Sequence, residues 1–281
     1  MHGLTVETRI QSVPVKAPTP TLELFSSARV SGRTVVQIGS VKMGAGQPVV
    51  MAGPCSVESY EQLLATAEAV KSAGAVILRG GAYKPRTSPY DFQGLGVEAL
   101  RILSRVRRET GLPIVSEVLS TDDVEIVAEH VDMLQVGARN MQNFALLRRL
   151  GLLRKPVLLK RSPAATVREW LLAAEYLLAG GNNQVVLCER GIRSYDPDLR
   201  NTLDLAGMAL ARQLSHLPVI ADPSHATGRR DLIPAMCRAA LAAGADGLIV
   251  EVHPDPVNAI SDGKQSLDFP SFAHMMETMR N

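Results

Sequence analysis

The sequence predicts an α/β protein, a (β/α)8 barrel preceded by a short β-hairpin. The chain has 281 residues, a length at which α/β barrels commonly form one domain. Short runs rich in Val, Ile and Leu alternate with longer segments of helical periodicity, and the runs are continuous, as in parallel strands buried on both faces. Because eight such units follow one another, we favour a closed TIM barrel over a doubly wound sheet.

The N-terminal part of the chain differs from this repeat. Residues 1–34 are expected to form a partly flexible arm, because Pro14, Pro18 and Pro20 stand among polar residues. The stretch RTVVQIGSVKMGAGQPVVMAG (33–53) predicts short strands joined by glycine turns, hence a hairpin ahead of the barrel. Residues 35–281 are expected to form a single TIM-barrel catalytic domain.

The barrel elements follow in order along the rest of the chain. The apolar runs expected to form the strands are 48–53, 75–80, 113–118, 133–138, 156–161, 184–190, 218–225 and 247–253. The first helix is expected over 59–74, since Ser59 can cap its start and Gly74 its end. Further helices are expected over 166–181, 229–244 and 271–280.

Composition limits the possible partners and the compartment. The net charge is +2, from 30 basic and 28 acidic residues, so bulk attraction to nucleic acid or to a membrane is not expected. The three cysteines are too few for a disulfide framework, which favours a reducing compartment. The N-terminus lacks a signal-peptide core, and no run reaches the roughly 20 apolar residues of a membrane span. We therefore expect a cytoplasmic protein.

Charged residues gather where the predicted strands end, which is where barrel enzymes carry their chemistry. Such a cluster of cations repels itself unless an anion binds in it, and guanidinium groups suit phosphate and carboxylate. The cations expected along one side of the barrel mouth are Arg79, Lys84, Arg86, Arg139, Lys160, Arg161 and Arg190. A structural ring of salt bridges is the alternative interpretation.

A different set of side chains is expected on the other side of the mouth. Cys55 follows the first run, His225 ends the seventh, Glu251 lies in the eighth, and Asp262 follows it. Because the seventh, eighth and first strands of a closed barrel are neighbours, these four groups can meet. Thiolate, imidazole and carboxylates suit a divalent ion such as Mn, Fe, Co or Zn. Packing in the core is the alternative for Cys55 and our interpretation for Cys188 and Cys237.

These features favour a metal-dependent lyase or transferase acting on phosphorylated small molecules. A metal-dependent hydrolase and a non-catalytic anion-binding module remain alternatives. The hydrolase explains the cations less well, and the binding module does not explain the metal-ligating set.

Eight motifs follow in order along the chain: AGPCSVES, LRGGAYKPRTSPYDFQGLG, QVGARNMQNFALL, PVLLKR, CERGIR, RNTLDL, DPSHATG and EVHPDPVNAISDGKQSL. Together they resemble the 3-deoxy-D-arabino-heptulosonate 7-phosphate (DAHP) synthases of type I, in the short form without a regulatory domain. The resemblance implies condensation of phosphoenolpyruvate with erythrose 4-phosphate, the first step of the shikimate pathway to aromatic amino acids. The 3-deoxy-octulosonate 8-phosphate synthases, which use arabinose 5-phosphate, are the runner-up.

The resemblance also implies residue roles. Cys55, His225, Glu251 and Asp262 match metal ligands. The residues that match phosphoenolpyruvate contacts are Arg79, Lys84, Arg139, Lys160 and Arg190. Those that match contacts to the phosphate of erythrose 4-phosphate are Arg86, Thr87 and Ser88. Lys84 and His225 are the candidates for catalytic proton transfer. A homotetramer is implied, and because residues 1–34 are too short for a feedback domain, we expect any feedback to come from a separate regulatory partner.

Overall fold

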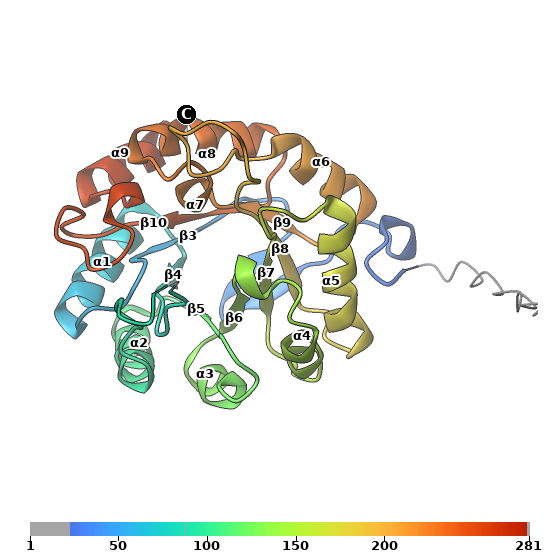
Figure 1. Ribbon diagram of the computed structural model, residues 1–281, viewed down its shortest axis with the longest axis horizontal. Helices are drawn as coiled ribbons and strands as arrows, with labels where there is room; N and C mark the ends of the chain where they lie inside the picture. The colour runs from blue at the N-terminus through green and yellow to red at the C-terminus, as the bar shows by residue number, and fades with distance from the viewer. Residues whose placement is uncertain (1–22, 87, 280–281) are drawn as a thin grey trace, which may run out of the picture.

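The computed structural model describes residues 23–86 and 88–279, and within them eight parallel strands close into a barrel (Figure 1). The strands follow chain order around the barrel until β10 pairs with β3 and closes it. They are β3 (Val49–Gly53), β4 (Ile77–Arg79), β5 (Ile114–Glu117), β6 (Met133–Val136), β7 (Val157–Lys160), β8 (Val185–Glu189), β9 (Val219–Ala221) and β10 (Gly247–Glu251). The predicted (β/α)8 TIM barrel is confirmed.

Helices surround the strands on the outside (Figure 1). They are α1 (Tyr60–Ala73), α2 (Val97–Thr110), α3 (Val124–His130), α4 (Phe144–Gly151), α5 (Val167–Ala179), α6 (Leu205–Leu214), α8 (Ile233–Ala242) and α9 (Phe269–Thr278). The first helix begins and ends as predicted, because the Ser59 side chain accepts from the backbone of Gln62 and Gly74 is left-handed. Among the described residues, no helix combines the length and apolar character needed to cross a bilayer.

One predicted strand is shorter than expected. The run 218–225 forms a strand only as far as Ala221, and the short helix α7 (Pro223–Thr227) follows. The side chain of Asp222 accepts a hydrogen bond from the backbone N–H of His225, and Pro223 occupies the first turn, so this segment starts a helix. His225 therefore lies on α7 rather than at a strand end.

The apolar core has two layers. Side chains inside the barrel include Met51, Ile77, Leu158 and Cys188, while the alternate strand residues pack outward against the helices. All three cysteines are buried, and Cys188 and Cys237 serve as core residues, as predicted.

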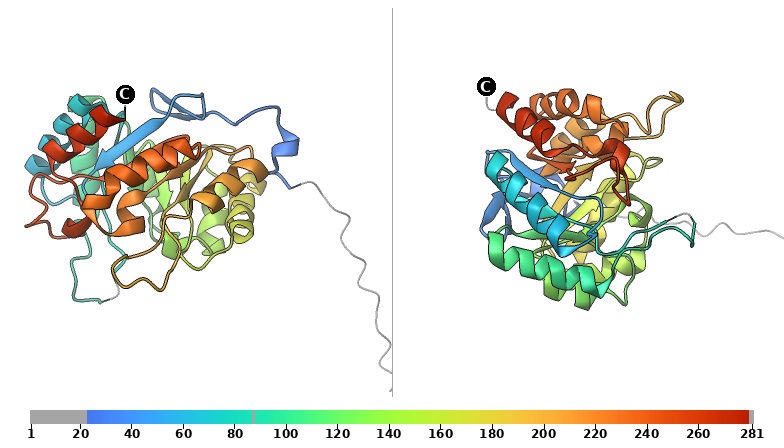
Figure 2. Two further views of the ribbon diagram at one scale, coloured as in Figure 1. Left: turned by 90° about the horizontal axis from the view of Figure 1, so that it is seen from above. Right: turned by 90° about the vertical axis from the view of Figure 1, so that its left-hand side faces the viewer.

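A hairpin covers the N-terminal end of the barrel. Strands β1 (Val36–Ile38) and β2 (Val41–Met43) pair antiparallel, and Gly39 in their turn has a φ of +56°. Apolar side chains of the hairpin join the interior layer of the barrel. The hairpin lies at the end opposite to the long loops that follow β4 and β8 (Figure 2).

The residues ahead of the hairpin contact the outer helices. The carboxylate of Glu175 on α5 accepts the backbone N–H groups of Leu24 and Phe25, at 2.9 and 3.1 Å. His216 contacts the oxygen of Leu24 and the hydroxyl of Thr34, both at 2.7 Å. Residues 1–22 lie outside the described part, so the division into a flexible arm (1–34) and a barrel domain (35–281) stays a prediction.

Candidate functional site

A cavity of about 480 Å³ opens at the C-terminal ends of the barrel strands. Most of its charged lining is basic. The lining residues include Arg79, Lys84, Arg86, Arg139, Lys160, Arg190, Arg193 and Arg200, with Asp91, Glu117 and Asp262 as acidic members. The cavity thus offers a surplus of positive charge to an anionic ligand.

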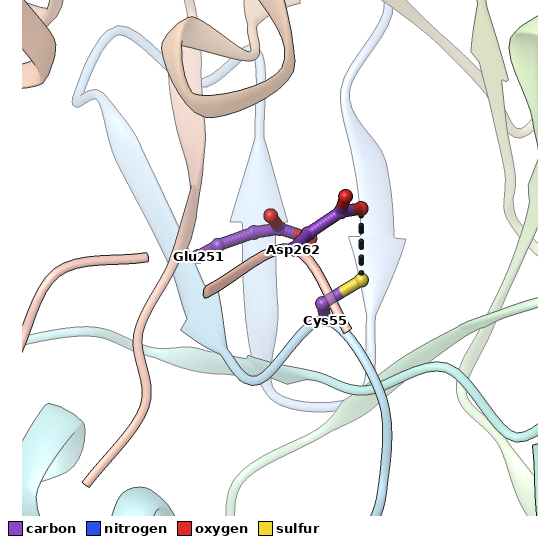
Figure 3. Close-up of side chains that lie close together, drawn as sticks. All are labelled: Cys55, Glu251 and Asp262. Atoms are coloured by element: carbon purple, nitrogen blue, oxygen red, sulfur yellow. Dashed lines mark hydrogen bonds between the residues drawn. The ribbon is translucent and has the colours of Figure 1, made fainter. Parts of the chain in front are cut away.

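Three potential metal ligands meet beside the cavity (Figure 3). Cys55 follows β3, Glu251 ends β10, and Asp262 lies in the loop between β10 and α9. Their ligand atoms all lie within 4.8 Å of one another, and Cys55 Sγ is 3.2 Å from Asp262 Oδ2. The pairing of β10 with β3 brings these residues together, because Glu251 stands beside Gly53 in the register.

His225 on α7 approaches the same cluster. Its Nε2 lies 3.4 Å from Glu251 Oε1 and 4.0 Å from Asp262 Oδ2. Its Nδ1 lies 2.8 Å from the carboxylate of Asp222. A carboxylate at one ring nitrogen is the common way to orient a histidine whose other nitrogen binds a metal.

The electrostatics of these groups follow from burial and close charges. Burial, followed by the negative charge of Glu251, raises the pKa of the Cys55 thiol to about 12. Burial also lowers the pKa of His225, against the pull of Asp222, so the imidazole is neutral near pH 7. Burial alone would raise the pKa of Asp262, but His225 and Arg200 lower it to about 2.

This donor set fits a divalent metal ion. One sulfur and two carboxylates, from Cys55, Glu251 and Asp262, form the group whose ligand atoms lie within 4.8 Å of one another. The neutral imidazole of His225 is not part of that group but lies 3.4 Å from Glu251, and the four groups together suit Mn, Fe, Co or Zn. The thiol, whose pKa is raised, would have to lose its proton on metal binding.

The buried cations of the cavity differ in how they are neutralised. Arg79 Nη1 is 2.9 Å from Glu251 Oε1, and Lys160 Nζ is 2.5 Å from Asp222 Oδ2. Arg190 is 7% exposed, and no hydrogen bond or ion pair joins its guanidinium to any residue of 23–86 or 88–279. Burial lowers the pKa of Arg190, and the negative charge of Asp222 opposes this only in part, so the buried guanidinium carries a desolvation cost. A bound anion would remove that cost.

Arg161 does not belong to this group of cations, contrary to the sequence-based expectation. Its guanidinium makes ion pairs with Glu189 and Asp204 at 2.9 and 2.8 Å. It also lies over the ring of Trp170 on α5. Successive strand residues point to opposite faces, so Lys160 faces the cavity and Arg161 faces the helices.

The loop after β4 holds the other predicted anion contacts. Arg86 lines the cavity, and its Nη2 donates to Ser261 Oγ at 2.5 Å. Arg139 reaches the same loop and donates to the oxygen of Pro85 at 3.2 Å. The Ser88 hydroxyl accepts from the backbone of Tyr90, and Thr87 lies outside the described residues. The roles of Arg86, Thr87 and Ser88 stay predictions.

Several residues of the site were not predicted. Arg193, Arg200 and Asn201 line the cavity from the loop after β8. Gln265 donates to Glu251 Oε2 at 2.6 Å, and Asp222 joins Lys160 to His225. Asp222 had a usable signal, an acidic residue before proline at a helix start. Loop residues such as Arg193 follow no periodic pattern from which the direction of the side chain could be predicted.

Comparison with known proteins places this site in a family context. The model of the DAHP synthetase I family matches residues 25–281. The phospho-2-dehydro-3-deoxyheptonate aldolase of Thermotoga maritima is 52% identical over 247 residues, covering 88% of this chain and 73% of the relative. A 2-dehydro-3-deoxyphosphooctonate aldolase of Acidithiobacillus ferrooxidans is 37% identical over 232 residues, covering 76% of this chain and 82% of that protein.

Solved structures agree with the sequence matches. A crystal structure of the Thermotoga maritima DAHP synthase has a TM-score of 0.89 and 50% identity, covering 92% of this chain and 76% of that one. A truncated form of the 3-deoxy-D-arabino-heptulosonate 7-phosphate synthase from Thermotoga maritima has a TM-score of 0.85 and 47% identity. It covers 92% of this chain and 94% of the truncated chain.

Proposed function

The chain belongs to the DAHP synthetase I family, and from this premise we propose how its residues perform the family's reaction. The chain condenses phosphoenolpyruvate with D-erythrose 4-phosphate to give DAHP and inorganic phosphate. This is the first step of the shikimate pathway. The observation that carries the assignment to residues is the cation-lined cavity beside the cluster of Cys55, Glu251 and Asp262.

Phosphoenolpyruvate binds on the cations of the cavity. It carries a phosphate and a carboxylate on three carbons, so a compact group of cations can hold both. Arg190, whose guanidinium forms no hydrogen bond or ion pair with the described residues, binds one of these anions together with Arg139, Lys160, Arg79 and Lys84. Erythrose 4-phosphate places its phosphate on Arg86, with Thr87 and Ser88 as further donors.

Cys55, His225, Glu251 and Asp262 hold a divalent metal ion. When bound, this ion polarises the aldehyde carbonyl of erythrose 4-phosphate. Asp222 holds the ring of His225 through Nδ1 and leaves Nε2 facing the carboxylates. His225 therefore acts as a ligand rather than as a proton donor, since the burial that lowers its pKa keeps the ring neutral.

Lys84 donates the proton that the reaction requires at the aldehyde oxygen. Burial alone lowers the pKa of Lys84, but the sulfur of Cys55 and the charge of Glu251 raise it, so the side chain stays an ammonium. Its Nζ is 2.8 Å from Cys55 Sγ and therefore beside the metal position. A proton held there neutralises the oxygen as the aldehyde is consumed.

The atoms of the reaction balance in three events. C3 of phosphoenolpyruvate attacks the aldehyde carbon, and the carbonyl electron pair moves to its oxygen, which takes the proton. Water then adds at C2 and loses one proton, which restores the ammonium of Lys84. The bond between C2 and the phosphate oxygen breaks as the remaining C2 hydroxyl becomes the ketone, and the proton of that hydroxyl leaves with the phosphate from the cations that bound it.

One assay tests the reaction and the metal dependence. Phosphate release from phosphoenolpyruvate is measured with erythrose 4-phosphate and with arabinose 5-phosphate, after chelation and after adding back one metal at a time. We expect release with erythrose 4-phosphate, its loss on chelation and its recovery with metal. Faster release with arabinose 5-phosphate would move the assignment to the octulosonate synthases, and full activity in excess chelator would exclude the metal.

The compartment and the oligomer belong to the same proposal. A cytoplasmic location is supported by the three free cysteines. A homotetramer and a separate regulatory partner rest on resemblance to the family alone. Light scattering of the purified chain measures its mass in solution, and a monomer or dimer would contradict the tetramer.

A further inference from the structure

Glu58 links the two segments that carry Cys55 and Asp262. It stands three residues after Cys55, in the connection between β3 and α1. Its Oε1 accepts the backbone N–H of Ile260 at 2.9 Å, and its Oε2 lies 3.3 Å from His253 Nε2. The Glu58 side chain is 14% exposed and that of His253 is 6% exposed, so their contact is largely shielded from water, whereas the hydrogen bond from Ile260 lies at the surface.

The ring of His253 is held in place beside the carboxylate of Glu58. Its Nδ1 accepts the backbone N–H of Asp255 at 3.0 Å, so the proton of a neutral ring is on Nε2, toward Glu58. Within the described residues the buried Nε2 forms no hydrogen bond, and the carboxylate of Glu58 is the charged group beside it. Glu58 and His253 therefore hold both ends of the segment 253–260 against the turn after Cys55.

The loop that is held in this way carries two functional side chains. Ser261 directly follows Ile260, and its Oγ lies 3.1 Å from Cys55 Sγ and 2.5 Å from Arg86 Nη2. Asp262 comes next and has a φ of +53°, the only positive φ of a non-glycine residue within the described residues. Such a backbone conformation is unfavourable for a residue with a side chain and persists only where the surrounding contacts impose it.

We propose that Glu58 and His253 are positioning residues, which fix Asp262 against Cys55 in the metal site and Ser261 against Arg86. This inference rests on the proposed metal ligands and adds residues that touch neither the metal nor a substrate. Because the contact of Glu58 with Ile260 is adjacent to both side chains, its loss should weaken metal binding and the aldose phosphate contact together. Phosphoenolpyruvate, whose main cations lie on β4, β6, β7 and β8 or directly after them, should bind as before.

The test is titration of the metal-free protein with Mn²⁺ by calorimetry. Glu58→Ala should weaken Mn²⁺ binding by about 10- to 100-fold, as expected when the support of a metal ligand is removed. Glu58→Gln should recover part of the loss, because its amide oxygen can still accept from Ile260. In the metal-saturated enzyme, KM for erythrose 4-phosphate should rise more than KM for phosphoenolpyruvate. The matched control is Glu68→Ala, an exposed position on α1.

The outcomes separate this inference from the proposed function. If the wild-type protein binds no Mn²⁺, or if Cys55→Ser binds it equally well, the metal ligands themselves are wrong. If Glu58→Ala binds Mn²⁺ as tightly as Glu68→Ala, the positioning role alone is wrong. Equal weakening of Mn²⁺ and phosphoenolpyruvate binding would show a general loosening and would also overturn it. If Glu58→Ala does not fold, Glu58→Gln and His253→Ala decide, and wild-type Mn²⁺ affinity in both rejects the inference.

Discussion

The Nζ of Lys84 lies 2.8 Å from the Sγ of Cys55 and also donates to the Cys55 carbonyl oxygen at 3.1 Å. The ammonium of Lys84 thus lies directly beside the sulfur, which favours a positive charge there. A metal ion on Cys55 would take over that role and release Lys84 toward the substrate. The pair therefore couples the metal site to the proposed proton donor.

Metal binding should release a proton from Cys55. Because the thiol pKa is about 12, the group is protonated at pH 7.5, and a metal must displace that proton to bind the thiolate. Metal and proton compete, so the apparent affinity should rise about tenfold per pH unit between pH 7 and 9. Calorimetry in two buffers of different ionisation enthalpy measures the release.

Two cysteine variants check this interpretation. Cys55→Ser should lose most of the metal affinity and the associated proton release, while Cys237→Ala, which changes a buried residue of α8, should keep both. Undiminished proton release by Cys55→Ser would show that another group supplies the proton.

Replacing Lys84 should affect kcat more than metal binding. Lys84→Met removes the proposed proton donor, and loss of general acid catalysis typically costs 10²- to 10⁴-fold in rate. Metal affinity should not fall, since the ammonium only competes for the sulfur. Phosphate release measures kcat, and Lys42→Met, at the exposed position of β2, is the control. A Lys84→Met enzyme with normal kcat would remove Lys84 from the chemistry.

Arg190 should lower the stability of the free protein while strengthening the binding of phosphoenolpyruvate. Arg190→Met removes a buried charge that forms no hydrogen bond or ion pair in residues 23–86 and 88–279, so the metal-free and substrate-free variant should unfold at a higher temperature. The same change should weaken phosphoenolpyruvate binding roughly 10- to 150-fold, the range for a lost hydrogen bond to a charged group.

Thermal unfolding and direct titration of phosphoenolpyruvate measure the two effects. Arg101→Gln on the exposed face of α2 should change neither. A variant that is less stable than the wild type would indicate that Arg190 has a structural partner instead.

The predictable part of the site comes from strand order. The first and last strands of a closed barrel must be neighbours, so Cys55 and Glu251 could be placed together from the sequence. Arg161 was misplaced because the strand end was treated as one cluster, although adjacent residues on a strand face opposite sides. The conformation of Asp262 and the direction of Arg193 depend on loops, whose geometry follows from tertiary contacts rather than from a repeat.

The final prediction concerns the close approach of β3 and β4. A Cβ added at Gly53 would lie 2.0 Å from the backbone oxygen of Arg79, and Gly53 also has a φ of +154°, which side chains rarely adopt. Gly53→Ala should therefore push apart the strand ends that carry Cys55 and Arg79, and we expect loss of metal binding and of activity even where the protein stays folded. Gly111→Ala is the control, because it has a φ of +73° but open space around it, so it bears only the backbone cost of about 1–2 kcal/mol. Circular dichroism, Mn²⁺ titration and phosphate release together compare the two variants. If Gly53→Ala behaves like Gly111→Ala in all three, close contact at this strand end is not required for the site.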